Sequence, residues 1–378
     1  MQLKDRLITK VKNLTGKRVL LRLDLNVPIG ENGEIENTFR LEAVIPTIKY
    51  LVNKKAKVII VSHLGSDGEK SLATIVNYLS KHFQTIFFPD LDNLFQIEKM
   101  KNGEVAILEN IRRAAGEMLN DDKVAKWLAE LGDIYVNDAF AVSHREQSSI
   151  VGVPKYLPSY VGPLFMAEYD NLAKAFTPDH PFLFILGGAK FKTKIPLLKK
   201  FIAKADNVFV GGALANTFYH KLGFRIGKSL FDGELPGLTE FLKNKKLKLP
   251  SDVAVAHGAE KLTRSPEKVQ TNEIISDIGP ETLSVLKKII AQAQFILWNG
   301  PLGNFEKGFD WGTKELAKAI AGSKAFSVVG GGDTVSAIAD LGLDDKFGFV
   351  STAGGAMLDF LGTGTLPGIE AILKSVKS

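Results

Sequence analysis

The chain has 378 residues, more than one hydrophobic core ordinarily serves, so we expect two domains of about 150–200 residues each. Apolar residues make up 45% and charged residues 24%, as in an ordinary soluble globular protein, and no run of about 18 apolar residues could span a membrane. Cysteine is absent, which excludes disulfides, thiolate nucleophiles and cysteine-bound metals. The N-terminal residues lack the apolar core of a signal peptide, so we predict a cytoplasmic enzyme.

The net charge is +6 and the isoelectric point is about 9.1. Nucleic-acid binding would require a concentrated basic stripe with interleaved aromatic residues, and the sequence has none. We therefore predict no nucleic-acid partner and favour small anionic substrates.

Apolar runs alternate with amphipathic segments along the whole chain, and this alternation indicates parallel sheets built from β-α-β units. Strands are predicted, in chain order, at 18–24, 56–63, 104–109, 133–137, 181–186, 207–211, 252–256, 294–299, 325–329 and 348–351. Helices are predicted at 121–132, 281–293 and 313–322. The sequence therefore predicts an α/β protein with parallel β-sheet cores flanked by helices.

The two halves of the chain differ in arginine and glycine. Seven of the nine arginines precede residue 150, and 25 of the 35 glycines follow residue 180. Arginine binds carboxylates and phosphates through two parallel hydrogen bonds, whereas glycine-rich strand ends hold the phosphates of a nucleotide through the backbone. We expect a small anion in a domain at 1–160 and a nucleotide in a domain at 161–365, the second beginning with a linking helix near 162–176.

Polar residues follow the predicted strands of the first half, where ligands of open α/β sheets gather. The first strand ends in Arg22-Leu23-Asp24-Leu25-Asn26-Val27-Pro28, and its alternation predicts that three polar side chains share one face. Arg40, His63, Arg112 and Arg145 lie just beyond strand ends or at the next helix start. Each alone also fits a structural role, such as a surface arginine or a hydrogen-bonding histidine, but their coincidence favours a site.

In the second half the strands run into glycines and helix starts. The run Ser327–Thr334 places three glycines, an aspartate and a threonine before an apolar helical pattern, which predicts a phosphate site with a cation beside it. Gly187-Gly188-Ala189-Lys190 precedes Lys194 by one helical turn, so both ammonium groups can reach one face. Glycines also follow predicted strands at Val210–Ala213, Trp298–Glu306 and Ser351–Gly355. Packing alone could also explain such glycines. Gly223–Ser229 resembles a phosphate-binding P-loop, but it is one residue short and follows a predicted helix, so we reject it.

Together these motifs resemble the phosphoglycerate kinase family over essentially the whole chain. Eight blocks match in order: Arg22–Pro28, Ser62–Gly65, Leu108–Arg112, Tyr135–Arg145, Gly187–Lys194, Trp298–Glu306, Gly330–Thr334 and Ser351–Gly355. The resemblance implies two Rossmann-like domains joined by a hinge helix, with a C-terminal helix at 366–378 that packs back on the first domain. It also implies a monomer without membrane or nucleic-acid partners.

The resemblance implies reversible phosphoryl transfer between 1,3-bisphosphoglycerate with Mg·ADP and 3-phosphoglycerate with Mg·ATP. The residues that would hold the phosphoglycerate are Arg22, Asp24, Asn26, Arg40, His63, Arg112 and Arg145. Those that would hold the nucleotide are Gly188, Ala189, Lys190, Lys194, Gly211, Gly212, Asn299, Pro301, Glu306, Gly330, Gly331, Gly332, Asp333 and Thr334, with Asp333 near Mg²⁺. Arg40, Lys190 and Lys194, with the helix start at Gly354 and Gly355, would neutralise the transferring phosphoryl group.

Several positions depart from the family pattern. Ser66 stands where an arginine is usual, which removes one anion contact and predicts weaker phosphoglycerate binding, unless Arg113, in place of a phenylalanine, supplies the charge. Gln147 replaces a histidine and Thr193 an aspartate, while Ala213 and Ala353 each replace a glycine. These departures keep open a kinase of altered acyl-phosphate specificity. A catalytically silent nucleotide-binding switch is the third hypothesis, but Arg40, Lys194 and Asp333 are all present. A nicotinamide dehydrogenase is excluded, because the first strand ends in Arg-Leu-Asp-Leu-Asn and not in a glycine-rich turn.

Overall fold

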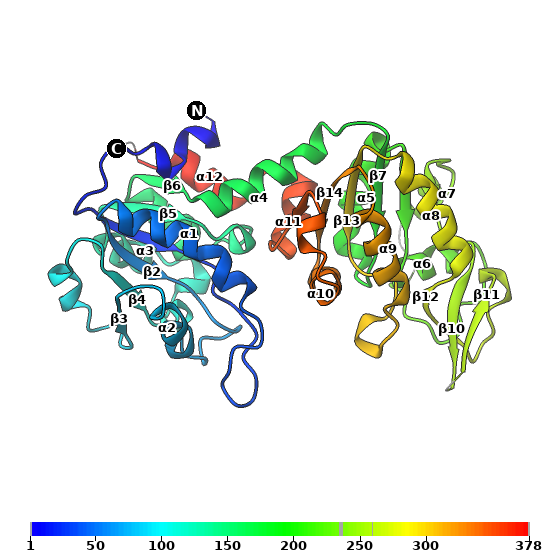
Figure 1. Ribbon diagram of the computed structural model, residues 1–378, viewed down its shortest axis with the longest axis horizontal. Helices are drawn as coiled ribbons and strands as arrows, with labels where there is room; N and C mark the ends of the chain where they lie inside the picture. The colour runs from blue at the N-terminus through cyan, green and yellow to red at the C-terminus, as the bar shows by residue number, and fades with distance from the viewer. Residues whose placement is uncertain (1, 234–236, 259, 377–378) are drawn as a thin grey trace. The chain divides into compact units, whose positions relative to one another are not determined.

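The computed structural model describes residues 2–233, 237–258 and 260–376 and divides into two compact units (Figure 1). The first unit comprises Met1–Asp170 and Thr363–Ser378, and the second comprises Asn171–Gly362. The division falls within helix α4 (Pro163–Ala173), so the chain passes from one unit to the other along a helix. The domain limits expected from the sequence, 160/161 and 365/366, stay a prediction.

The first unit contains a six-stranded parallel sheet with strands in the order β3-β4-β2-β1-β5-β6. The strands are β1 (Arg18–Arg22), β2 (Lys57–Val61), β3 (Thr85–Phe88), β4 (Val105–Leu108), β5 (Ile134–Asn137) and β6 (Ser159–Val161). The helices are α1 (Phe39–Asn53), α2 (Ala73–Leu79), α3 (Asp122–Glu130) and α12 (Pro367–Lys374), together with short 3-10 turns.

Successive residues of β1 pack into two different cores. Leu21 lies in a cluster with Leu41 and Val44 of α1, whereas Leu20 lies in a second cluster with Leu128 of α3. Because side chains alternate along a strand, the two clusters occupy opposite faces of the sheet. Both faces are therefore covered, and polar side chains are left to the strand ends.

The second unit contains another six-stranded parallel sheet, in the order β15-β14-β13-β7-β8-β9. Its strands are β7 (Phe182–Leu186), β8 (Asn207–Val210), β9 (Leu247–Lys248), β13 (Phe295–Asn299), β14 (Phe326–Gly330) and β15 (Phe349–Val350). Its helices are α5 (Phe191–Lys204), α6 (Ala213–Lys221), α7 (Leu238–Leu242), α8 (Pro280–Gln292), α9 (Trp311–Ala321), α10 (Gly332–Asp340) and α11 (Gly355–Thr363). The predicted α/β class with two parallel sheets is confirmed.

A small antiparallel sheet joins β11 (Glu260–Arg264), β10 (Val253–His257) and β12 (Ile274–Ile278). The strand predicted at 252–256 corresponds to β10, but it does not belong to the parallel sheet as the sequence pattern suggested. The reason is the connection to β11, where His257 pairs with Glu260. A link of this length forms a hairpin and is far too short for a parallel crossover.

Carboxylates from distant parts of the chain cap four helices. In each case the carboxylate accepts a backbone N–H of the first helical turn, which otherwise lacks a partner, and its charge opposes the helix dipole. The four pairs are Asp138 with Phe165 of α4 at 2.7 Å, Asp232 with Phe191 of α5 at 2.7 Å, Asp252 with Thr282 of α8 at 2.7 Å and Asp277 with Gly312 of α9 at 2.8 Å. Helix starts are thus fixed by tertiary contacts at the strand ends.

Within residues 2–233, 237–258 and 260–376, no helix combines the length and the apolar character that a membrane crossing requires.

Candidate active site

Arg22, the last residue of β1, has a buried guanidinium group with an exposed fraction of 1%. Its Nε donates to Ser149 Oγ at 3.0 Å and its Nη1 donates to the carbonyl of Leu23. Ser149 in turn donates from its backbone N and its hydroxyl to the buried Glu117 carboxylate, at 2.9 and 2.6 Å. Burial lowers the pKa of Arg22 and the charge of Glu117 opposes that effect. The sequence patterns did not single out Glu117, which begins a short 3-10 turn at Glu117–Leu119.

His63, just beyond β2, lies among four arginines. Its Nδ1 is 3.4 Å from Arg22 Nη2, and burial followed by the charges of Arg22, Arg112, Arg145 and Arg40 lowers the pKa of His63 to about 2. The imidazole is therefore neutral at physiological pH, and Nδ1 can accept from a guanidinium N–H. The four arginines predicted to hold an anion are thus grouped around a histidine that adds no further positive charge.

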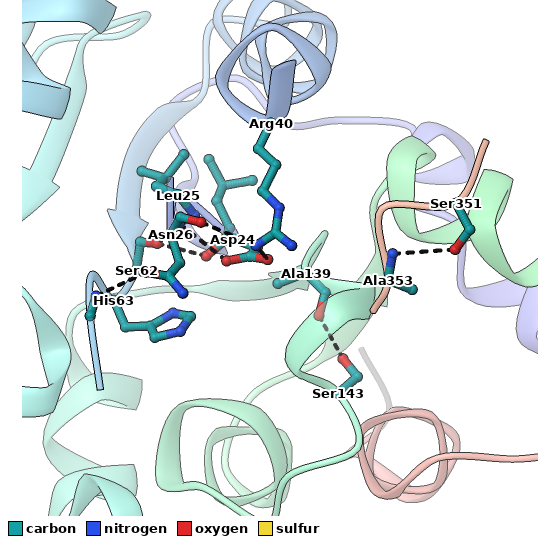
Figure 2. Close-up of polar contacts among 12 residues, drawn as sticks. Asp24, Leu25, Asn26, Arg40, Ser62, His63, Ala139, Ser143, Ser351 and Ala353 are labelled. Carbon is teal, nitrogen blue, oxygen red and sulfur yellow. Dashed lines mark hydrogen bonds and ion pairs between the residues drawn. The ribbon is translucent and has the colours of Figure 1, made fainter. Parts of the chain in front are cut away.

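Asp24 and Asn26 orient the remaining groups of this cluster (Figure 2). Arg40 Nη1 donates to Asp24 Oδ2 at 2.8 Å and to the carbonyl of Asn26 at 3.1 Å. The side-chain oxygen of Asn26 accepts the backbone N–H of Gly65 at 2.9 Å. All seven residues predicted to hold the phosphoglycerate therefore lie at one edge of the first sheet, and their roles in binding stay a prediction.

The loop at 65–70 is held by side chains that follow β4. Arg112 Nη1 donates to the carbonyl of Gly65, and Arg113 donates from Nε to the carbonyl of Gly68 at 2.9 Å and from Nη2 to that of Glu69 at 3.1 Å. Arg113 Nη1 also donates to the buried carboxylate of Glu109 at 3.0 Å. The loop and Glu109 thus engage the Arg113 guanidinium, which favours a structural role over the extra anion contact considered from the sequence.

Ser66 belongs to the same loop and is exposed, and its hydroxyl donates to Asp67 at 3.1 Å. The position therefore presents a short polar side chain bound to a neighbouring carboxylate. We therefore still expect this edge of the site to have one positively charged side chain fewer than the family pattern, and phosphoglycerate binding to be weaker.

In the second unit, a cavity of about 460 Å³ opens beside the ends of β7, β8 and β13. Five of the predicted nucleotide-binding residues line it: Gly188, Ala189, Gly212, Pro301 and Asp333. Its other wall is formed by residues of α6 beyond Ala213 and of the antiparallel strand β12, which the sequence did not indicate, and by the segment after Pro301, most of which lies in the Trp298–Glu306 motif. The antiparallel sheet thus contributes directly to the cavity.

Glycines after β7, β8 and β13 allow three backbones to approach one another. Gly188 N donates to the carbonyl of Pro301 at 2.8 Å, and a Cβ on Gly212, whose φ is +62°, would lie 2.8 Å from Gly188 N. A Cβ on Gly211 would press against Leu302 at 2.8 Å. Packing therefore accounts for these glycines, whereas a Cβ on Gly332 or Gly354 would meet nothing within 4 Å, which leaves room for a ligand.

Lys194 projects from the first turn of α5 towards these glycines. Its side chain is 8% exposed, and its Nζ donates to the carbonyl of Gly187. A Cβ on Gly188 would lie 2.9 Å from Nζ, and one on Gly300 would lie 2.7 Å from it. Burial lowers the pKa of Lys194 to about 8, and the charge of Asp333 opposes this effect. Lys190, in contrast, is exposed at the start of the same helix.

Among the residues that the structure describes, the other predicted ones do not line this cavity and lie at the strand ends and helix starts of the second unit. Asn299 is buried at the end of β13 and Thr334 is buried in α10. Gly330 ends β14, Gly331 lies between β14 and α10, and Gly354 precedes Gly355, the first residue of α11. Thr193 donates to the carbonyl of Lys190 at 2.9 Å, and Ala353 N donates to Ser351 Oγ at 3.2 Å. Glu306 lies in the short turn Phe305–Lys307, and its side chain is outside the described part of the structure.

Comparison with known proteins identifies the family. The family model for phosphoglycerate kinase matches residues 8–363. The chain belongs to the phosphoglycerate kinase family. It is 40% identical to a phosphoglycerate kinase of Pseudothermotoga lettingae over 98% of this chain and 100% of that protein.

Solved phosphoglycerate kinase structures share the fold. The Coxiella burnetii structure matches with a TM-score of 0.85 at 40% identity, covering 97% of this chain and 98% of that one. The Pyrococcus horikoshii OT3 structure matches with a TM-score of 0.83 at 34% identity, covering 99% and 98% respectively. The expected family, fold class and kinase activity are therefore confirmed.

The residues around the cavity fit the Mg·nucleotide that the phosphoglycerate kinase family uses. Asp333 is an exposed carboxylate at the cavity edge, and the neighbouring Gly332 leaves its surroundings open. Carboxylate oxygen suits Mg²⁺, which usually keeps phosphate and water ligands as well. Lys194 supplies a buried ammonium group next to Gly188, which lines the cavity.

The neutral state of His63 predicts an acid-sensitive contribution to stability. The unfolded chain protonates His63 near its ordinary pKa of about 6.5, whereas the folded chain does not until about pH 2. Stability is therefore lost as pH falls below about 6.5, by about 2 kcal/mol for this group at pH 5. We expect the fall in Tm between pH 7 and pH 5, measured by calorimetry, to be smaller in His63→Gln than in the wild type.

The exposed His82 supplies the control for this comparison. His82→Gln should retain the wild-type fall in Tm. An equal fall in His63→Gln would contradict a neutral buried His63.

The contacts of Arg113 predict a selective effect on the acceptor substrate. Arg113→Leu removes the hydrogen bonds to Gly68, Glu69 and Glu109, so the 65–70 loop becomes less rigid. Gly65 of this loop contacts both Arg112 and Asn26, and these two side chains are then held less firmly. We expect KM for 3-phosphoglycerate to rise about tenfold, the effect of losing one charged hydrogen-bonded contact, with KM for Mg·ATP unchanged.

Arg18→Leu is the matched control, because Arg18 is a partly exposed arginine that pairs with Asp133 at the other end of β1. Steady-state kinetics should show both KM values unchanged in that variant. A rise of both KM values in Arg113→Leu would argue against a local role for the loop.

Proposed function

We propose that this chain catalyses the reversible transfer of a phosphoryl group between 1,3-bisphosphoglycerate with Mg·ADP and 3-phosphoglycerate with Mg·ATP. The observation that carries the proposal is the grouping of Arg22, Arg40, Arg112 and Arg145 around the neutral His63. Such a cluster suits a small substrate with both a phosphate and a carboxylate. The glycolytic role of the family also supports the cytoplasmic location expected from the sequence, while a monomeric state stays a prediction.

In the first unit, the arginines would bind the acceptor and Asp24 and Asn26 would orient it. Asp24 holds Arg40 at 2.8 Å, which restricts the guanidinium to a narrow range of positions. His63 would accept or donate a hydrogen bond without adding charge. The acceptor carboxylate is already ionised at neutral pH, so no side chain has to act as a general base.

In the second unit, backbone groups at the glycine-rich strand ends would bind the nucleotide, and Asp333 would hold Mg²⁺. Mg²⁺ bound with the nucleotide would neutralise phosphate charge. Lys194 is placed to contact the transferring phosphoryl group, with Lys190 and the start of α11 at Gly354 and Gly355 as further donors. When substrates are bound, Lys194 Nζ would donate to a phosphate oxygen in place of the carbonyl of Gly187.

Transfer would require the two units to approach each other, because the acceptor residues and the nucleotide residues belong to different units. Closure would exclude water, which otherwise competes as the phosphoryl acceptor. The catalytic contribution of the chain is therefore positioning and charge neutralisation, as phosphoryl transfer requires.

A kinase of altered acyl-phosphate specificity is the second candidate, and the exposed Ser66 is the observation that favours it. Turnover of 3-phosphoglycerate compared with other small carboxylates would distinguish the two candidates.

The proposed role of Lys194 predicts the outcome of a coupled assay with Mg·ATP and 3-phosphoglycerate. We expect robust turnover of the wild type and a fall in kcat of about 100-fold or more in Lys194→Ala, the scale of losing one donor to transition-state charge. Lys199→Ala, which alters an exposed lysine of the same helix, should keep wild-type kcat. Wild-type protein that binds Mg·ADP without turnover would contradict the proposed function.

A further inference from the structure

Asp277, near the end of β12, is a buried carboxylate beside the nucleotide cavity, outside the family motifs described above. Its exposed fraction is 5%, and it is one of the residues that line the cavity. Its Oδ2 accepts the backbone N–H of Gly312 at 2.8 Å, and its Oδ1 accepts that of Ile278 at 2.8 Å. Both carboxylate oxygens therefore have backbone donors.

The contact with Gly312 fixes the start of α9. Asp310, the residue before that helix, makes no side-chain capping hydrogen bond, so the cap comes from Asp277 on another element. Gly312 is seated directly against the carboxylate, because a Cβ there would clash with Asp277 Oδ1 and would lie 2.6 Å from Ile278 Cγ1.

The same carboxylate also supports the other end of the segment at 302–312. A Cβ on Gly303 would lie 2.6 Å from Asp277 Cγ, so this glycine too is packed against it. Asn304 N donates to the carbonyl of Ser276 at 2.7 Å, and Leu302 N donates to Thr313 Oγ1 at 2.9 Å. The segment is thus attached at both ends to β12 and α9, with Asp277 between the two attachments.

This segment forms part of the cavity wall. Leu302, Gly303, Asn304, Phe305 and Lys307 line the cavity, and the short turn that they include also carries Glu306. A shift of the segment would therefore change the shape of the nucleotide cavity without touching the arginine cluster of the first unit.

We propose that Asp277 is a positioning residue for nucleotide binding, which holds the 302–312 segment in the shape that receives the nucleotide. The inference rests on the proposed function, since it assigns the cavity to the nucleotide. It adds to that function a residue that does not bind the nucleotide itself but holds the 302–312 segment in place.

The electrostatic surroundings of Asp277 are consistent with this role. Burial raises the pKa of Asp277 to about 6, and hydrogen bonds from Gly312 and Ile278 oppose the rise. Asp310 raises the pKa further and Lys261 lowers it. The carboxylate is thus still mostly ionised near pH 7.5, where it accepts both backbone donors.

Asp277→Asn is the test variant, because it keeps the side-chain shape and loses one of the two acceptors. The affinities for Mg·ADP and for 3-phosphoglycerate are measured separately by isothermal titration calorimetry. We expect the dissociation constant of Mg·ADP to rise about tenfold, the cost of one unsatisfied buried donor, and that of 3-phosphoglycerate to stay within about twofold.

Asp252→Asn is the matched control. Asp252 is also a buried carboxylate that caps a helix of the second unit, accepting Thr282 N at 2.7 Å and Glu281 N at 3.0 Å, and it does not line this cavity. It should lower the Tm without weakening Mg·ADP. Wild-type Mg·ADP affinity in Asp277→Asn, or an equal loss in Asp252→Asn, would overturn the proposal.

If Asp277→Asn does not fold, Gly312→Ala provides the same comparison, because its methyl group would clash with Asp277 Oδ1 and Gly312 does not itself line the cavity. Unchanged Mg·ADP affinity in that variant would also overturn the proposal. Calorimetry measures binding and needs no turnover, so the two proposals can fail separately. A wild type that binds Mg·ADP but shows no turnover would contradict the proposed function, and the role of Asp277 would still be decided by the Mg·ADP affinities of the variants. A wild type that does not bind Mg·ADP would overturn both.

Discussion

Both large sheets consist of parallel strands, and the side chains of the central strands are buried on both faces, which determines where the chemistry can lie. Polar groups reach a ligand at the strand ends, where the chain turns towards a helix. In the first unit the strand ends carry arginines around His63, and in the second they carry glycines around Lys194. The difference between the sites therefore follows from which residues occupy equivalent places in two similar sheets.

The main elements and the grouping of the site residues could be predicted from the sequence. Short apolar runs such as those of β7 and β13, which alternate with amphipathic helical segments and end at glycine or asparagine, indicate buried parallel strands, so their positions follow from the pattern. Because parallel strands end at one edge of a sheet, residues such as Arg22, His63 and Arg112 were expected to lie together, and the structure places them so. The family motifs added the identity of the ligands, which spacing alone does not determine.

The remaining features depend on contacts between residues far apart in the chain. Strands β3 and β6 are too short to stand out from the sequence, and β11 is largely polar, so the hairpin that it forms with β10 was not predicted. The capping of α5, α8 and α9 by Asp232, Asp252 and Asp277 leaves no local signal, because the residues before those helices make no side-chain cap. For the same reason the sequence left the role of Arg113 open, although its guanidinium is engaged by the 65–70 loop.

The central claim is that the acceptor and the nucleotide bind to chemically different sites on separate units. The most direct test is calorimetric titration of Arg112→Gln with 3-phosphoglycerate and, separately, with Mg·ADP. The account predicts that affinity for 3-phosphoglycerate falls about tenfold or more, because one charged donor is lost, while affinity for Mg·ADP is unchanged. A parallel loss of Mg·ADP affinity, or unchanged binding of 3-phosphoglycerate, would contradict it.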